Sequence, residues 1–329
     1  MKYDFVSFGD VTTDCFIRLK DARVNCDIND ENCQLCLKFG QKVPFESATI
    51  VRAVGNGTNA AVAAARIGLV SAAVTEMGDD ENGRECLKTL QDFGVHTEYI
   101  GIHAGQPTNY HYVLMYEAER TILIKHEKYE RTVPKFDEPP KWFYLTSLAD
   151  GTEDFQHWIA KYAKENGVKL CFQPGTFQIK MGKDALADIY ATSEIFFCNK
   201  EESQQILGTP EEHDIKNLLT GIRALGPKIT VITDGRNGSY IMNDEGSWSI
   251  PMYPDPAPPI NRTGAGDATA STTVAFLALG LPPHEALMRG LVNAASVVQG
   301  IGAQTKLLTH DEIEAWYAKR PPEFVATAL

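Results

Sequence analysis

The sequence lacks the features that would assign it to several common classes of protein. No apolar run reaches the ~18 residues of a membrane-spanning helix. Basic residues are in the minority, since 31 Lys and Arg stand against 43 Asp and Glu and the formal net charge is −12. An acidic chain argues against nucleic acid or an acidic membrane as a partner, although a local site can still bind an anion. With no internal repeat and no low-complexity linker, the 329 residues suit one large α/β domain or two modest ones.

Cysteine is scarce, and its number is odd. Seven cysteines without regular spacing do not make a disulfide framework, which favours the reducing cytoplasm as the location. Asp4 lies early in the chain and the first residues lead directly into a strand-like segment, so we expect no signal peptide. Three of the cysteines lie in the polar segment 20–48, namely Cys26, Cys33 and Cys36. We predict free thiols there, and a zinc site completed by Cys15 is the alternative.

The most informative stretch is Asn261–Asp267, with the sequence NRTGAGD, which lies between a Pro-rich loop and a helical run. Two glycines allow the backbone to approach a ligand closely and to point consecutive N–H groups in one direction. The positive end of the following helix adds a further preference for an anion. A carboxylate beside such a turn is what a kinase needs in order to take a proton from a substrate hydroxyl. The alternative is an ordinary helix start with an Asp in its first turn.

A second glycine-rich element, Gly55–Ala60, follows a strand-like segment and precedes an Ala-rich helix. Its Gly-x-Gly-x-x-Ala pattern mimics a dinucleotide-binding fingerprint, and Glu76 follows at roughly the 20-residue spacing of a ribose-binding acid. These features support an NAD-dependent dehydrogenase that uses Gly55 and Gly57. Two observations weigh against it: a complete strand with its own Gly turn, Phe5–Gly9, comes first, and the stretch ending at position 267 would have no role.

Strand-like and helical segments alternate along the second half of the chain. Strands are expected at Trp142–Thr146, Lys169–Gln173, Glu194–Cys198 and Ile229–Thr233. Helices are expected at 153–166, 183–191, 201–207, 211–225, 267–279, 283–299 and 310–318. Such alternation predicts a parallel sheet with helices on both faces. Earlier in the chain, Tyr110–Tyr116 and Thr121–Lys125 predict a β-hairpin around the turn 117–120.

Taken in order, these elements resemble a ribokinase/PfkB-type carbohydrate kinase over nearly the full length of the chain. The segments that carry the resemblance are Gly9–Asp14, Gly55–Asn59, Met77–Gly83, Asn199–Glu202, Thr233–Gly238 and Thr263–Ala268. The resemblance implies an α/β fold, with a ribokinase-like, doubly wound and mostly parallel sheet flanked by helices and a small β-sheet lid. Residues 1–329 are then expected to form a single kinase domain, with the lid built from 15–49 and 97–129.

The resemblance also implies roles for individual residues. Asp267 is expected to be the catalytic base, and the anion hole is expected to consist of Gly264, Ala265 and Gly266. The expected substrate-binding residues are Asp14, Gly55, Asn56 and Asn59. The expected nucleotide-contacting residues are Asn199, Thr233, Gly235, Gly238 and Asn293. Glu202 is expected to lie near Mg²⁺, which prefers few protein ligands and keeps several waters.

The reaction implied is transfer of the ATP γ-phosphate to a primary hydroxyl of a sugar or sugar-like substrate, with ATP and Mg²⁺ as cofactors. A nucleoside kinase of the same family is the alternative within the class. Exposed strand edges in the lid are compatible with a homodimer through the lid.

Three places depart from the family pattern. Val54 replaces the usual first Gly of its pair, and Gln173-Pro174-Gly175 replaces a common Asp-Pro-Asn. Asn261 and Arg262 replace the usual Asp-Thr before the glycine turn. Because that Asp helps to hold a monovalent cation in some relatives, activation by potassium is doubtful for this chain.

Overall fold

The core of the fold is a large mixed β-sheet in the computed structural model, which describes residues 1–26, 33–117 and 119–329. The strand order is β16-β15-β14-β13-β12-β11-β10-β1-β6-β7. The strands are β1 (Phe5–Phe8), β6 (Ser71–Gly78), β7 (Ile100–His103), β10 (Trp142–Leu145), β11 (Lys169–Phe172), β12 (Ser193–Asn199), β13 (Ile229–Thr233), β14 (Ser239–Asn243), β15 (Gly246–Ile250) and β16 (Thr327–Ala328). Neighbouring strands are parallel from β7 to β13, and β14, β15 and β16 continue the sheet antiparallel.

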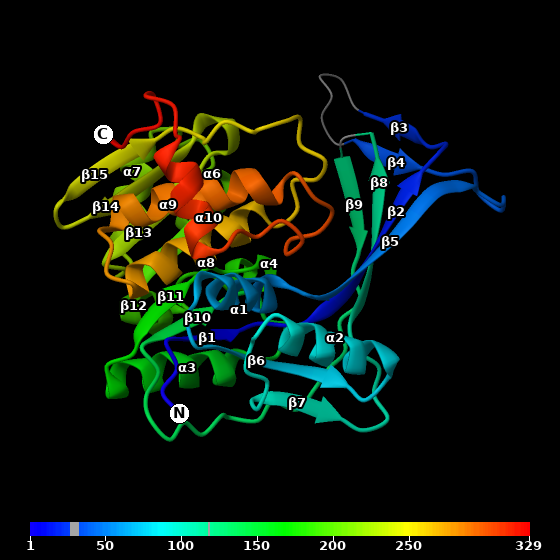
Figure 1. Ribbon diagram of the computed structural model, residues 1–329, viewed down its shortest axis with the longest axis horizontal. Helices are drawn as coiled ribbons and strands as arrows, with labels where there is room; N and C mark the ends of the chain where they lie inside the picture. Colours follow the sequence, from blue (N-terminus) through cyan, green and yellow to red (C-terminus); the bar gives the residue numbers. More distant parts are fainter. Residues whose placement is uncertain (27–32, 118) are drawn as a thin grey trace.

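Helices cover both faces of this sheet (Figure 1). One face carries α1 (Asn56–Ile67), α8 (Ala265–Ala278), α9 (Pro283–Val297) and α10 (His310–Ala318). The other carries α3 (Glu153–Asn166), α4 (Thr176–Met181), α5 (Ala187–Thr192), α6 (Lys200–Leu207) and α7 (Ile215–Arg223), while α2 (Glu81–Asp92) packs near β6. Side chains alternate along β1, so Phe5 joins the first layer and Val6 and Phe8 the second. In the described part of the chain, no helix has the length and apolar character needed to cross a membrane.

The strand order reverses at β1, which lies between β10 and β6 and is parallel to both. In open α/β sheets, ligands bind outside the carboxyl ends of the strands at such a switch point. Gly9 directly follows β1, while Asn199 and Thr233 are the last residues of β12 and β13. The topology therefore gathers several of the predicted site residues along one edge of the sheet.

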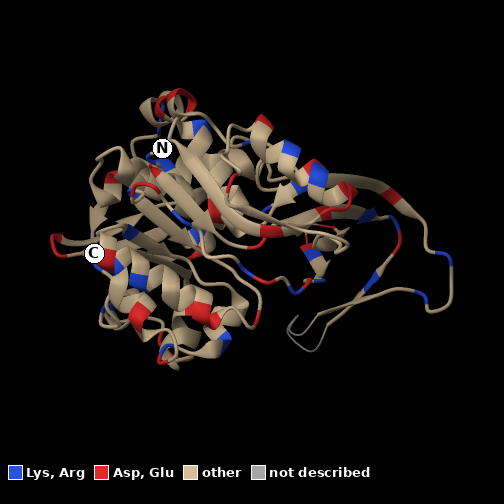
Figure 2. Cartoon of the chain, turned by 90° about the horizontal axis from the view of Figure 1, so that it is seen from below, with Lys and Arg blue, Asp and Glu red and all other residues tan. Residues whose placement is uncertain are grey.

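A second sheet, called the lid below, projects from the body as an arm (Figures 1 and 2). Its order is β5-β2-β8-β9, with β2 (Thr12–Leu19), β5 (Phe45–Val54), β8 (Tyr110–Tyr116) and β9 (Glu119–Leu123). A short pair, β3 (Arg23–Asn25) and β4 (Gln34–Cys36), lies at the far end of the arm. The predicted hairpin is confirmed as the antiparallel pair β8 and β9. The expected lid segment 97–129 is only partly used, because β7 pairs with β6 in the main sheet.

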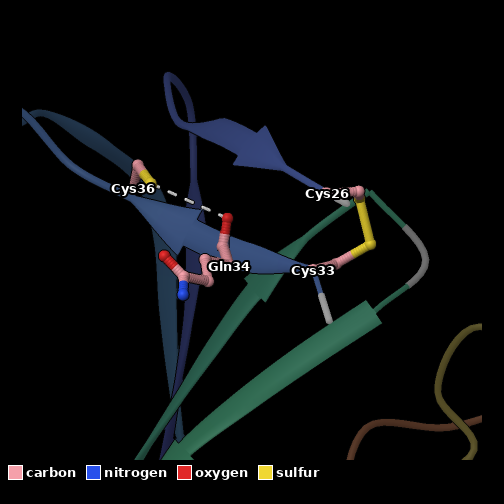
Figure 3. Close-up of a disulfide and its surroundings, with 4 residues drawn as sticks. All are labelled: Cys26, Cys33, Gln34 and Cys36. Atoms are coloured by element: carbon pink, nitrogen blue, oxygen red, sulfur yellow. Dashed lines mark hydrogen bonds between the residues drawn. A yellow bond between two sulfur atoms is a disulfide. The ribbon is translucent and has the colours of Figure 1, made fainter. Parts of the chain in front are cut away.

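The prediction of free thiols in the cysteine-containing segment is wrong at two positions. Cys26 and Cys33 form a disulfide next to the antiparallel pair β3 and β4 (Figure 3). Cys36 is a free, exposed thiol, and Cys15 is buried in β2. The zinc alternative loses two of its four ligands to this bridge, and the described residues contain no group of three or more His, Cys, Asp or Glu that could hold a metal.

Candidate active site

A cleft of ≈ 470 Å³ is lined on one side by the body and on the other by the lid. The predicted site residues that line it are Asp14, Gly55, Asn56, Asn59, Glu202, Gly264, Gly266 and Asp267. Ala265 lines a smaller neighbouring pocket instead. The start of α1 and the glycine turn before α8, which are far apart in the sequence, therefore share one cavity.

Asp267 lies in the first turn of α8, and its side chain connects this helix to α1. Asn56 donates from Nδ2 to Oδ1 of Asp267 at 2.9 Å, and Asn59 donates from Nδ2 to Oδ2 at 2.8 Å. Burial raises the pKa of Asp267, and the hydrogen bonds from Asn59 and Asn56 oppose that rise because they favour the ionised form. Each carboxylate oxygen is thus oriented by one amide at the wall of the cleft, an arrangement suited to accepting a proton.

Gly264 is the N-cap residue of α8 and has a left-handed conformation, with φ of 86°. A Cβ at this position would lie 2.3 Å from the Cβ of Ala303, so both the backbone angle and the close approach require glycine. The turn is closed by a hydrogen bond from Ala268 N to Gly264 O at 2.8 Å, and Asn261 Oδ1 accepts from Thr263 N at 2.6 Å. Ala265 N donates to Arg262 O at 3.4 Å. The free N–H groups that a helix start provides, together with its positive end, would suit this turn to binding an anion.

Glycine residues allow the start of α1 to pack closely against the backbone that follows β1. Gly55 has φ of 124°, and a Cβ there would lie 2.1 Å from the carbonyl oxygen of Asp10. A Cβ at Gly57 would lie 2.8 Å from the Cα of Gly9. The spacing of these glycines is thus explained by backbone packing against β1, which brings the first turn of α1 to the floor of the cleft.

The lid and the loop after β1 contribute acidic side chains to the other end of the cleft. Asp14 in β2 and His111 in β8 are cross-strand neighbours, with Oδ1 and Nδ1 3.3 Å apart. Asp10 accepts from the backbone N–H of Ala149 at 2.7 Å and forms an ion pair with Arg131. Arg131 thus neutralises Asp10, whereas the ion-pair neighbour of Asp14 among the described residues is the imidazole of His111.

His126, to which none of the sequence motifs assigns a role, also lines the cleft. Its Nδ1 lies 3.9 Å from Oδ2 of Asp10, and its ring centroid lies 5.2 Å from that of His111. Burial lowers the pKa of His126, while Asp10 opposes this change, so the neutral imidazole is favoured. Among the described residues, Asp14 Oδ1, His111 Nε2 and His126 Nδ1 are buried without a hydrogen-bond partner, which is the condition expected of atoms that meet a ligand.

A pocket of ≈ 170 Å³ adjoins the cleft, and both Arg262 and Gly266 line the two cavities. Three of the predicted nucleotide-contacting residues line it: Thr233, Gly235 and Gly238. Apolar side chains complete its wall: Met252, Tyr253, Leu291 and Val298. A largely apolar pocket next to an anion-binding turn suits the base of a nucleotide whose phosphates reach the cleft.

The remaining predicted nucleotide-contacting residues lie outside this pocket. Asn199 caps α6, since its Oδ1 accepts from Glu202 N at 2.7 Å while Glu202 Oε2 accepts from Asn199 N at 2.8 Å. Asn293 is fully buried in α9, where it donates to Thr272 Oγ1 at 2.8 Å and accepts from Leu308 N at 2.9 Å. Because both polar atoms of the Asn293 amide serve helix packing, the predicted contact between Asn293 and nucleotide is not supported.

Glu202 brings a carboxylate from the first turn of α6 to the cleft. Burial raises the pKa of Glu202, and the hydrogen bond from Asn199 N opposes that rise. Only Oε2 is used in capping the helix. One carboxylate beside an anion-binding turn fits Mg²⁺, which in phosphate sites is held by one or two carboxylates, phosphate oxygens and water.

The chain is similar in sequence and in structure to known carbohydrate and nucleoside kinases. A model of the pfkB family carbohydrate kinase matches residues 24–310. Ribokinase of Bacillus subtilis (strain 168) is 25% identical over 271 residues, which cover 79% of this chain and 86% of that protein. The structure of Arabidopsis thaliana ribokinase complexed with ribose and ATP has a TM-score of 0.76 at 19% identity, over 96% of this chain and 98% of that one. Methanocaldococcus jannaschii nucleoside kinase has a TM-score of 0.77 at 19% identity, over 97% and 99%.

The sheet, the lid and the two solved structures define the ribokinase fold, and the family match makes the chain a kinase. More particularly, the chain belongs to the pfkB family of carbohydrate kinases. The dehydrogenase alternative is therefore wrong. Its proposed ribose-binding acid, Glu76, is 3% exposed and pairs with His103 at 2.8 Å, so it is not available to a cofactor.

Proposed function

We propose that this kinase transfers the γ-phosphate of ATP to a primary hydroxyl of a sugar or sugar-like acceptor. The observation that carries the proposal is the presence of Asp267 and the Gly264 turn in one cleft. Phosphoryl transfer needs alignment, a group that takes the hydroxyl proton, and stabilisation of charge on the transferred group. Ribose and ATP in the A. thaliana ribokinase structure support a sugar and ATP as the two ligands.

In the proposed reaction, the acceptor hydroxyl lies against Asp267 and Asp14 binds the rest of the acceptor. Asn56 and Asn59 line the cleft beside it and donate hydrogen bonds to Asp267. The hydroxyl oxygen attacks the γ-phosphorus, the bond from phosphorus to the β–γ bridging oxygen breaks, and Asp267 takes the proton. The N–H groups of the turn 264–266 and the guanidinium of Arg262 offset the negative charge. The products are ADP and the phosphorylated acceptor.

The nucleotide would bind with its base in the smaller pocket, against Thr233, Gly235 and Gly238, and with its phosphates toward Gly266. Glu202 would hold Mg²⁺, directly or through water, and the ion would supply positive charge beside the phosphates. The lid sheet, β5-β2-β8-β9, would close over the acceptor. Closure excludes water, which otherwise competes with the acceptor hydroxyl for the γ-phosphate.

A nucleoside is the second candidate acceptor, and a specific feature favours it. Ile122 and Ile124 line the cleft although their exposed fractions are 38% and 62%. Phe177 is also 39% exposed, and its ring centroid lies 6.2 Å from that of His126. Exposed apolar side chains at the rim of a polar cleft would suit a nucleobase beyond a ribose.

The test is a comparison of D-ribose with adenosine and cytidine as acceptors. ADP release would be followed in a coupled assay, with thermal shift in the presence of a non-hydrolysable ATP analogue as a binding measurement. Phosphorylation of any of these acceptors supports phosphotransfer, and the ratio of their kcat/KM values decides between sugar and nucleoside. Binding of NAD with no ATP-dependent stabilisation would contradict the proposal.

The activity should fall at acidic pH. Only the ionised Asp267 can take a proton, and burial raises the pKa of Asp267 above that of an exposed Asp. We therefore expect kcat to decrease as the pH falls through this pKa and to level off above it. The measurement is a pH profile of kcat at saturating acceptor and ATP. A kcat that stays constant down to the lowest pH at which the protein remains folded would contradict the role of Asp267 as the base.

The outer face of the lid supports a homodimer. Ile50, Cys15, Tyr112 and Leu123 form one row across the lid strands. Because side chains alternate along strands, this row lies on the face opposite Asp14 and His111. Ile50, Tyr112 and Leu123 are 49%, 47% and 52% exposed. We expect Leu123→Glu to shift the chain toward monomer in sedimentation velocity, whereas Ile122→Glu, on the cleft face, should not; equal sedimentation of all three proteins would argue against this interface.

A further inference from the structure

Gln304 is a buried polar residue that the proposed reaction leaves without a role. It is 4% exposed and lies in the segment between α9 and α10. It is not among the described residues that line the cleft or the nucleotide pocket. Its Nε2 donates to Oδ1 of Asn59 at 3.0 Å and to the carbonyl oxygen of Ala53 at 2.8 Å. One amide group thus contacts the residues on both sides of the glycine-rich start of α1.

The first of these hydrogen bonds determines which way the Asn59 amide points. An Asn side chain can present either its oxygen or its NH₂ group to a neighbour. Because Asn59 Oδ1 accepts from Gln304, its Nδ2 is directed at Oδ2 of Asp267, 2.8 Å away. The opposite orientation would place an amide oxygen against the carboxylate, and the hydrogen bond that favours ionised Asp267 would be lost.

The second hydrogen bond, from Gln304 to the carbonyl oxygen of Ala53, holds the backbone just before α1. Ala53 has φ of 57°, an uncommon conformation for a residue with a side chain. Its N–H donates to Sγ of Cys86 at 3.2 Å, and its carbonyl accepts from Gln304. Strained backbone persists where its surroundings over-determine it. Gln304 therefore fixes both the peptide that leads into α1 and the side chain that α1 directs at the base.

We infer that Gln304 is a positioning residue for the phosphotransfer reaction, acting on Asp267 through Asn59. The inference rests on the proposed function, in which Asp267 takes the proton. It assigns a role in catalysis to the loop between α9 and α10, whose residue at 304 is 245 positions from Asn59 in the sequence.

Gln304→Met tests the inference, since Met has a similar shape but cannot donate a hydrogen bond. We expect kcat to fall by up to about 100-fold, since misplacement of a reacting group by ~1 Å can have an effect of that size. The acidic limb of the pH profile of kcat should move to higher pH, because ionised Asp267 loses the support of Asn59. The KM for ATP should stay unchanged, since Gln304 does not line the nucleotide pocket.

Gln156→Met is the matched control. Gln156 is also a buried amide, 1% exposed, which donates to Thr152 and accepts from Gln178. Both variants should lose some thermal stability, but only Gln304→Met should move the acidic limb. If Gln304→Met does not fold, Gln304→Asn, which keeps the donor on a shorter side chain, should show the same shift in smaller degree.

The failures of the two proposals are distinguishable. An Asp267→Asn variant that remains active would overturn Asp267 as the base, whatever Gln304 does. An inactive Asp267→Asn together with a folded Gln304→Met that keeps the wild-type kcat and the wild-type acidic limb would overturn the inference on Gln304 alone.

Discussion

Replacement of Asp267 with Asn should remove phosphoryl transfer while the protein stays folded and still binds nucleotide. Asn has nearly the same shape as Asp, so its oxygen can still accept a hydrogen bond from Asn56 or Asn59. An amide cannot take the proton of the acceptor hydroxyl, and loss of a general base typically costs about 10²- to 10⁴-fold in rate. We expect kcat to fall by that factor, as measured by ADP release with saturating acceptor.

The control for this experiment is nucleotide affinity. The smaller pocket is lined by Thr233, Gly235 and Gly238 and is not lined by Asp267, so ATP should stabilise the variant and the wild type against heating by a similar amount. An Asp267→Asn variant that binds ATP normally and retains most of its kcat would show that the proton leaves by another route, and Asp267 would then lose its assigned role.

Much of the fold could be predicted because its elements carry strong local signals. The helix expected at 153–166 is found as Glu153–Asn166, with acidic residues in its first turn and Gly167 after its end. The helix expected at 183–191 is instead Ala187–Thr192, and Thr176–Met181 was not foreseen. Helices of six residues are too short to show a period, and tertiary packing decides whether they form.

Some residues of the candidate site could likewise be predicted from local sequence, and others could not. That Gly264 and Asp267 line the same cleft could be predicted because both residues lie in one short turn of the sequence. Arg131 and Gln304 could not, because their partners are remote in the sequence: Arg131 contacts Asp10, 121 positions away, and Gln304 contacts Asn59, 245 positions away. A single Arg or Gln in a loop shows no pattern, so only the fold reveals which of them meets the site.

Replacement of Gly264 with Ala should disable the anion-binding turn and weaken the fold at the same place. Gly264 has φ of 86°, and an added Cβ would lie 2.3 Å from the Cβ and 2.5 Å from the Cα of Ala303. A left-handed residue with a side chain costs about 1–3 kcal/mol, and the contact with Ala303 adds to this. The start of α8 must then shift, and misdirection of one charge-stabilising donor alone typically lowers kcat by about 10²- to 10³-fold. The measurements are kcat and the free energy of unfolding in denaturant.

Gly266→Ala, in the same turn, is the control that separates the loss of stability from the loss of activity. An added Cβ at Gly266 meets no atom within 4 Å, and Gly266 is not among the glycines of positive φ. Ala at this helix position should therefore leave the free energy of unfolding equal or slightly higher. Gly266 lines both cavities, so the methyl group of Ala at this position would contact a bound ligand rather than protein atoms, and we expect a higher KM for ATP. Equal loss of stability in the two variants would mean that the approach of Ala303 to the turn does not constrain Gly264, and the need for glycine would then come from the ligand alone.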